Sequence, residues 1–157
     1  MTHIEREILF ETSSEVLDVI TLLTSSHKEL LTKFSDYEQA SSVINKQHIV
    51  ESISSQIIIG MQAEEEIFYP AAKRVLKEKG IVSALIMHHA VLKYLLDELK
   101  SISAASDIHD IKVRVLGENV KQYIKEKQTK LFPKVIASGK LDLWMLGTQF
   151  LAHRKKN

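Results

Sequence analysis

The sequence has no cysteine, only two prolines and five glycines, and few aromatic residues, which make up 6% of its 157 residues. The absence of cysteine excludes disulfides, thiolate-bound zinc and iron–sulfur clusters, so any metal must bind through histidine, carboxylate or tyrosine. The low glycine and proline contents favour long helices over a turn-rich sheet protein. A chain of this length is expected to fold as one domain with a real core.

An excess of charge of one sign is also missing, since 21 Lys and Arg residues offset 20 Asp and Glu residues and leave a net charge of +1. This balance gives no overall attraction to nucleic acid or to an anionic membrane. The first residues, MTHIEREILFETSSE, are acidic and contain no apolar stretch of signal-peptide length. No uncharged run is long enough to cross a bilayer. We therefore expect a cytoplasmic protein that binds neither nucleic acid nor membranes.

Apolar residues recur at alternating steps of three and four in four long segments. This spacing is typical of helices that pack one face against neighbouring helices at a shallow angle. The segments run from an expected cap at Ser13 and Ser14 to Phe34, from Val50 to Ile67, from after Gly80, with Ser83 as the cap, to Leu99, and from Ile108 to about Pro133.

The links between the segments, around 36–46, 79–82 and 102–106, are short and polar. Short links make consecutive helices antiparallel. The stretch LDLWMLGTQFLAHRK follows Gly139 and indicates one more helix. We therefore predict an all-α fold, an up-down-up-down four-helix bundle with a short C-terminal extra helix. It forms a single domain over 1–157, with the bundle at about 14–135 and the extra helix at about 140–154.

The apolar stripes contain six residues that do not suit an aliphatic core, namely His27, Gly60, Glu64, His88, Tyr123 and Lys127. None of them is close to a predicted helix end, where polar groups reach water easily. We expect the other five side chains to point inward and Gly60 to leave a gap beside them. The neighbouring residues Glu65, Glu66 and His89 are expected at the rim, and the histidines expected at the surface are His3, His48, His109 and His153.

The two halves of the chain repeat one pattern. The spacing of Gly60, Glu64 and Pro70 is the same as that of Tyr123, Lys127 and Pro133, so EEEIFYP and KQTKLFP occupy matching places in two helical hairpins. Residues four apart lie on one helix face. Polar side chains from facing helices are how helical bundles build metal sites, which is what this pattern indicates.

On these residues the chain resembles the hemerythrin-like, or HHE cation-binding, family from about Val16 to Val135. The strongest pieces are LLTSSHKELL, AEEEIFYPAAK, HHAVLKYLLDEL and KLFPKV, and LGTQFLAHRKK is similar to the family's C-terminal helix. The resemblance implies a non-haem di-iron centre. The family pattern builds it from a His on the first and third helices and a His-x-x-x-carboxylate pair on the second and fourth.

Carried over by position, the resemblance implies three retained metal ligands, His27, Glu64 and His88. Three ligand positions are altered: Gly60 and Tyr123 stand in place of histidines, and Lys127 in place of a carboxylate. Tyr123 is a candidate phenolate ligand to ferric iron, although a core tyrosine with a hydrogen-bonded hydroxyl is the alternative.

Lys127 weighs against metal binding, because an ammonium about 5 Å from a dication is repelled by roughly 6–7 kcal/mol at an effective dielectric near 20. Glu64 and Lys127 together are neutral without a metal. We therefore predict a Glu64–Lys127 ion pair in place of the di-iron bridge, with His27, His88 and Tyr123 completing its hydrogen bonds.

The leading hypothesis is a hemerythrin-like binding protein, not an enzyme, whose depleted site holds one iron weakly or no metal. A metal ion or a small diatomic ligand is the partner if the site is occupied. One alternative is a functional di-iron protein acting on or sensing oxygen, peroxide or nitric oxide, or involved in iron–sulfur repair, with Tyr123 and His89 completing the metal shell. The other is a metal-free structural or interaction bundle. The sequence does not fix the oligomeric state.

Overall fold

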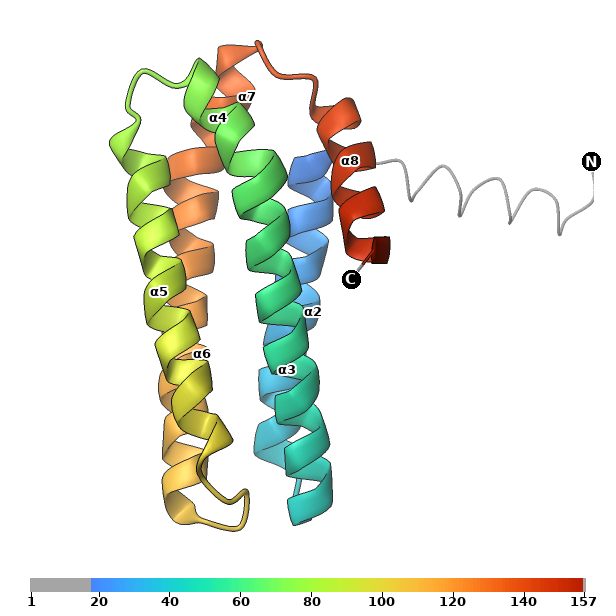
Figure 1. Cartoon of the computed structure of the whole chain (residues 1–157), viewed down its shortest axis with the longest axis vertical. Coiled ribbons are helices and arrows are strands. Elements are labelled where there is room, and N and C mark those ends of the chain that lie inside the picture. Colours follow the sequence, from blue (N-terminus) through green and yellow to red (C-terminus); the bar gives the residue numbers. More distant parts are fainter. Residues whose placement is uncertain (1–17, 157) are drawn as a thin grey trace, which may run out of the picture.

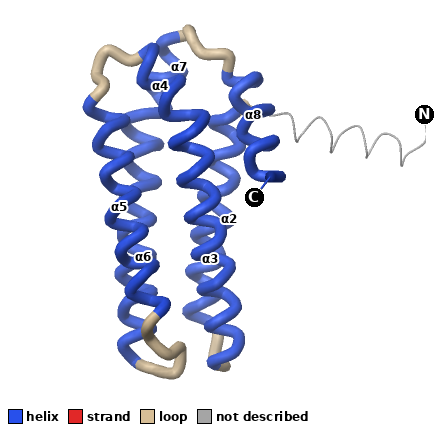
Figure 2. Tube along the Cα trace, in the orientation of Figure 1, coloured by secondary structure: helices blue, strands red, loops and turns tan. Residues whose placement is uncertain are grey.

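A computed structural model of the chain describes residues 18–156 (Figure 1). The expected cap at Ser13 and Ser14 and the surface position of His3 lie outside these residues. Every regular element within the described range is a helix, and this part of the chain contains no strand (Figure 2). The all-α prediction is confirmed.

Four long helices form an up-down-up-down bundle, as predicted (Figure 1). In chain order, α2 packs along α3 and α5 along α6. The connections at 40–42 and 101–106 are short, which forces each pair to be antiparallel. The bounds are Val19–Gln39 for α2, Val43–Ala63 for α3, Gly80–Lys100 for α5 and Asp107–Glu126 for α6.

Three of these helices begin at side-chain caps. Asp18 accepts a hydrogen bond from the backbone of Thr21 at 2.9 Å, and Ser42 and Ser106 cap α3 and α6. The third helix differs from prediction, because α5 already begins at Gly80 and Ser83 lies inside its first turn. The Ser83 hydroxyl bonds back to the carbonyl of Lys79 and does not cap the helix.

Both prolines lie within continuous helix, so the prediction that the fourth helix ends near Pro133 is wrong. The helix α3 continues through a π-helical segment η1, Glu64–Phe68, into α4, Tyr69–Val75. In the second half α6 continues through η2, Lys127–Leu131, into α7, Phe132–Ser138. In each copy the proline is the second residue after the π segment.

The π segments explain how the helices tolerate these prolines. The amide of Tyr69 bonds to the carbonyl of Glu64, and that of Phe132 to the carbonyl of Lys127, five residues back in both cases. A proline ring clashes with the carbonyl four residues earlier in an α-helix, and the wider π turn relieves this crowding. The repeated sequence thus becomes a repeated structure, whose two π segments open at Glu64 and Lys127.

The last helix, α8, spans Leu143–Lys156 and folds back beside α2, α3 and η1 (Figure 1). The preceding helix ends at Gly139, whose φ of 63° lies in the left-handed region that glycine tolerates best. Leu146 and Phe150 anchor α8 to the bundle and are buried. The predicted C-terminal extra helix is confirmed.

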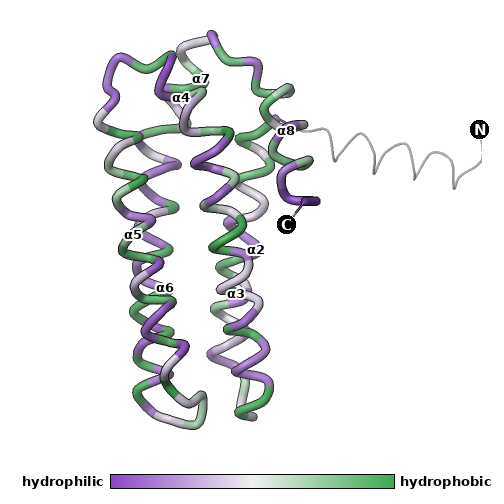
Figure 3. The backbone as a smooth tube through the Cα atoms, in the orientation of Figure 1, coloured by the Kyte–Doolittle hydropathy of each residue, from purple (hydrophilic) through white to green (hydrophobic). Residues whose placement is uncertain are grey.

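Apolar and polar residues alternate along the long helices, so that each places an apolar stripe in the core (Figure 3). The helix α5 also carries apolar side chains on its outer face, where Met87, Val91 and Tyr94 are exposed. Of the helices in residues 18–156, α5 is the one whose length and composition would suffice to cross a membrane. The core helices of soluble proteins pass the same test.

Candidate functional site

The two residues that open the π segments, Glu64 and Lys127, face each other inside the bundle. The Lys127 Nζ lies 2.7 Å from Glu64 Oε2, and the residues are 1% and 3% exposed, respectively. The predicted ion pair between these positions is therefore present. Burial lowers the pKa of Lys127 below its ordinary value, and the carboxylate of Glu64 opposes that shift.

His27 reaches this pair from α2, as the sequence predicted. Its Nε2 lies 2.6 Å from Lys127 Nζ, and its ring stacks on Phe132. A lysine ammonium has donors and no acceptor, so Nε2 must accept. Burial, and then the charge of Lys127, lower the pKa of His27 to about 2, which keeps the ring neutral. The single ring proton of His27 is therefore on Nδ1.

Two tyrosines complete the shell of the Glu64 carboxylate. The Tyr69 hydroxyl donates to Oε2 at 3.1 Å, and the Tyr123 hydroxyl lies 3.3 Å from Oε1 and also bonds to Tyr69. Burial, followed by the negative charge of Glu64, raises the pKa of both tyrosines well above the ordinary value. Lys127 Nζ lies 4.1 Å from the centre of the Tyr123 ring, a cation–π contact. Both tyrosines are thus neutral hydrogen-bond donors.

The sequence pattern does not predict that Tyr69 belongs to the site. Its place immediately after η1, with its hydroxyl bonded to Glu64, depends on the π turn. In the sequence, Phe68 and Tyr69 stand together before Pro70 and suggest core packing. The only sequence signal was its position five residues after Glu64, which matches no α-helical face contact.

The third-helix histidine in the network is His89, and the expected positions of His88 and His89 are reversed. His89 is 1% exposed, and its Nε2 hydrogen-bonds to the Tyr123 hydroxyl. Its Nδ1 lies 2.7 Å from Oε1 of Glu65. Glu65 is half-exposed at the rim of the bundle, as expected. His88 is half-buried instead, with Nδ1 3.8 Å from Glu126. Adjacent residues on a helix differ by about 100° in direction, so the two cannot both face the core.

The result is one continuous network that runs from the rim into the core. It contains Glu65, His89, Tyr123, Tyr69, Glu64, Lys127 and His27. Burial lowers the pKa of His89, against the raising effect of Glu64 and Glu65, so this ring too is favoured in its neutral form. The buried part therefore balances one cation with one anion, and it fixes the relative positions of α2, η1, α5 and η2.

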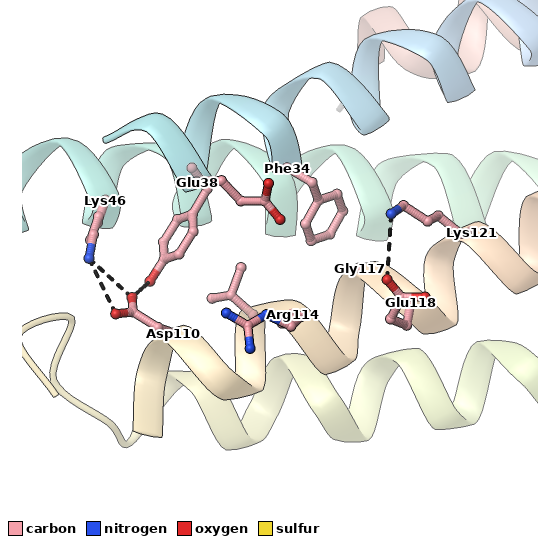
Figure 4. Close-up of a pocket in the computed structure, with 10 residues that line it drawn as sticks. Phe34, Glu38, Lys46, Asp110, Arg114, Gly117, Glu118 and Lys121 are labelled. Carbon is pink, nitrogen blue, oxygen red and sulfur yellow. Dashed lines mark hydrogen bonds and ion pairs between the residues drawn. The ribbon is translucent and has the colours of Figure 1, made fainter. Parts of the chain in front are cut away.

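A second polar cluster joins α2, α3 and α6 (Figure 4). The Tyr37 hydroxyl donates to Asp110 at 2.6 Å and lies 2.7 Å from His109 Nδ1, while Lys46 pairs with Asp110 at 3.2 Å. His109 is 3% exposed, so its expected surface position is wrong. Because the hydroxyl already donates to Asp110, His109 must donate from Nδ1, and this bond holds the ring inside.

A bundle of antiparallel helices with inward-pointing polar side chains is the architecture of helical-bundle proteins that bind metals and small ligands. The family described as Hemerythrin HHE cation binding domain matches residues 18–135. The chain belongs to this family, and the resemblance read from the sequence is confirmed.

A relative named DNA nickase, from Nostoc sp. (strain PCC 7120 / SAG 25.82 / UTEX 2576), is 22% identical over 143 residues. The match covers 89% of this chain and 40% of that protein, so the chain spans about two-fifths of its relative's length. No solved structure gives a significant match.

The residues present do not fit the di-iron centre that the family pattern implies. The Nε2 lone pair of His27 and one carboxylate oxygen of Glu64, both metal-binding atoms in that pattern, accept hydrogen bonds from Lys127. Within residues 18–156 no group of three or more His, Cys, Asp or Glu side chains is placed to hold a metal ion. His88, the third ligand predicted from the resemblance, lies outside the network.

Proposed function

We propose that this protein is a hemerythrin-like binding protein whose di-iron site is replaced by the Glu64–Lys127 ion pair, so that it holds one iron weakly or no metal. One observation carries the proposal: Lys127 Nζ lies 2.7 Å from Glu64 Oε2 and 2.6 Å from His27 Nε2. The ammonium of Lys127 thus forms hydrogen bonds with both candidate ligand residues, one from η1 and one from α2. A metal ion would have to displace a cation that is already paired and buried.

The role of the domain is then sensing, storage or contact with a partner, without chemistry on oxygen. The match to two-fifths of a longer relative supports a domain that also works as a module beside other segments. The nickase activity in that relative's name is not part of the proposal, because the match covers only 40% of that protein at 22% identity.

Metal content tests this proposal directly. We expect protein purified from iron-supplemented cells to contain well below one iron per chain after gel filtration, with no ligand-to-metal absorption band. Two tightly bound irons per chain, with such a band, would overturn the proposal.

A restored ligand set is the stricter test. The triple variant Gly60→His, Tyr123→His, Lys127→Glu should gain iron, because it removes the ammonium and adds the three missing ligands. The single variant Lys127→Met removes the ammonium without adding a ligand, and we expect it to gain little. A folded triple variant that remains free of iron would show that these positions do not correspond to the family's site.

One observation favours a second candidate, a single-metal protein that uses the replacement ligands. His89 Nε2 and the Tyr123 hydroxyl lie 3.8 Å and 3.3 Å from Glu64 Oε1. These groups could bind one ferric ion if Lys127 moved away. This candidate predicts a phenolate-to-iron absorption band that disappears in Tyr123→Phe, whereas the leading proposal predicts no such band in either protein.

A further inference from the structure

A small cavity of about 40 Å³ lies beside the buried network, at the position of Gly60. His27, Gln56, Glu64 and Lys127 are among its lining residues. A Cβ atom added to Gly60 would meet no atom within 4 Å, so no neighbouring side chain fills the space next to this glycine. A single water needs roughly 10–15 Å³, so the cavity has room for a molecule of about three heavy atoms.

Two polar atoms of the lining residues have no hydrogen-bond partner among residues 18–156. They are Nδ1 of His27, a residue that is 7% exposed, and Oε1 of Gln56. Such atoms are costly when buried alone, and native structures nearly always satisfy them. They therefore call for a hydrogen-bond partner from outside the chain, either water or a small ligand.

The hydrogen-bond chemistry of the two atoms can be assigned. Lys127 donates to Nε2 of His27, so Nδ1 carries the ring proton and is a donor. The amide nitrogen of Gln56 lies 2.9 Å from the backbone carbonyl of Ser26, an acceptor only, so Oε1 is the free acceptor. The cavity thus offers one donor and one acceptor. Its only charges, Lys127 and Glu64, already neutralise each other.

The cavity adjoins a groove at the surface of the bundle. A groove of about 420 Å³ between α2, α3 and α8 shares four lining residues with it, namely Ser26, Gln56, Gly60 and Phe150. Gly60, which has no side chain, lies where the groove and the cavity meet. The cavity and the groove are therefore separated by few atoms at Gly60.

We propose that the Gly60 cavity is a binding site for a small neutral molecule that carries an acceptor and a donor side by side, of the carboxamide class. Its carbonyl oxygen accepts from His27 Nδ1, and its N–H group donates to Gln56 Oε1. Charged ligands of the same size are disfavoured, because an added charge would disturb the neutral pair of Lys127 and Glu64. The proposal concerns ligand binding and goes beyond the iron content of the site.

Formamide, with three heavy atoms, is the probe. We titrate the full-length protein, with the metal content of the same sample measured, and follow the ¹⁵N signals of the His27 ring and the Gln56 side-chain amide. We expect saturable shifts with a dissociation constant of about 1–50 mM, the range open to so small a ligand. Formate, equal in size but anionic, should give no saturable shift.

Two variants should abolish the response. Gly60→Leu fills the cavity and Gln56→Leu removes its acceptor, and each should weaken formamide binding at least about tenfold. Gly80→Leu is the matched control, since a Cβ added there also meets no atom within 4 Å, and its affinity should stay within about twofold.

The proposal is overturned if formamide gives only linear shifts, since water alone then satisfies the two atoms. It is also overturned if formate saturates with equal affinity, or if folded Gly60→Leu still binds formamide. Iron in the sample would count against the proposed function alone, because the titration reports on the Gly60 cavity separately.

Discussion

Lys127 Nζ lies 2.7 Å from Glu64 Oε2, and the two residues occupy matching positions at the start of the two π segments. One half of an internal repeat therefore supplies the cation and the other half the anion. Because both side chains are buried, each is costly without the other. We therefore expect the pair to affect both metal binding and the stability of the bundle.

A double-mutant cycle on this pair should show strong coupling. Glu64→Gln or Lys127→Met alone should each lower the free energy of unfolding by about 3–5 kcal/mol, because each leaves one buried charge unpaired. The double variant should lose much less than the sum of the two. Urea unfolding followed by circular dichroism measures all four proteins.

The exposed pair Lys134–Glu78 is the control for this cycle, because its atoms are equally close, at 2.6 Å. Lys134→Met should cost less than about 1 kcal/mol, since water screens exposed pairs. Additive losses at Glu64 and Lys127 would show that the two charges do not depend on each other.

The protein should lose stability as the pH falls below about 6.5. The folded state keeps His27 neutral down to a pKa of about 2, whereas the unfolded chain takes up this proton near pH 6.5. The unfolded state then binds more protons, so the free energy of unfolding falls with falling pH, by up to about 1.4 kcal/mol per pH unit for this group. The lowered pKa of His89 acts in the same direction.

Urea unfolding between pH 8 and pH 5 measures this slope. In His27→Gln, whose amide oxygen can still accept from Lys127, the slope over this range should be shallower than in the unaltered protein. An unchanged slope would mean that His27 does not remain neutral in the folded state.

The second polar cluster should contribute to stability through Tyr37. Tyr37→Phe removes the donor to Asp110 and the acceptor for His109, and should lower the free energy of unfolding by about 1–3 kcal/mol. Tyr94→Phe makes the same chemical change on a side chain that is 64% exposed. It should change the free energy of unfolding by less than about 0.5 kcal/mol. Equal effects of the two variants in urea unfolding would argue against the buried cluster.

Gly60 and Gly117, which lie inside α3 and α6, should respond differently to alanine. Gly60→Ala should stabilise the protein by up to about 1 kcal/mol, because the added methyl meets nothing and restricts the unfolded chain. In Gly117→Ala the new Cβ would lie 3.1 Å from the Phe34 ring, so the gain should be reduced or reversed (Figure 4). Thermal unfolding measures the stability of the two variants. An equal gain in melting temperature in both would show that Phe34 moves aside freely.

The adjacent histidines show where prediction from the sequence reaches its limit. Leu85 and Leu92 are seven residues apart, and both His88 and His89 fall three or four residues from each of them. The apolar periodicity is therefore equally compatible with either histidine facing inward. Only the packing of α5 against η1 and α6, with Glu65 and Tyr123 as partners, selects His89.

The first turn of α6 shows the same limit. Ile108 looked like the inward residue because it is apolar, yet it is 56% exposed, and His109 is buried instead. The hydrogen bond that His109 donates to Tyr37, a residue distant in the sequence, outweighs the local hydrophobic preference. The apolar pattern within one helix cannot predict a hydrogen-bond partner that lies on another helix.

The sequence by itself determined the four amphipathic helices, the internal repeat, the family, and the replacement of a carboxylate by Lys127, because these depend on residue type and spacing along one chain. The tertiary structure decided which histidine joins the network, that Tyr69 binds Glu64, and that the helices pass through both prolines by π turns. These features depend on contacts between helices and on backbone geometry, which local periodicity leaves open.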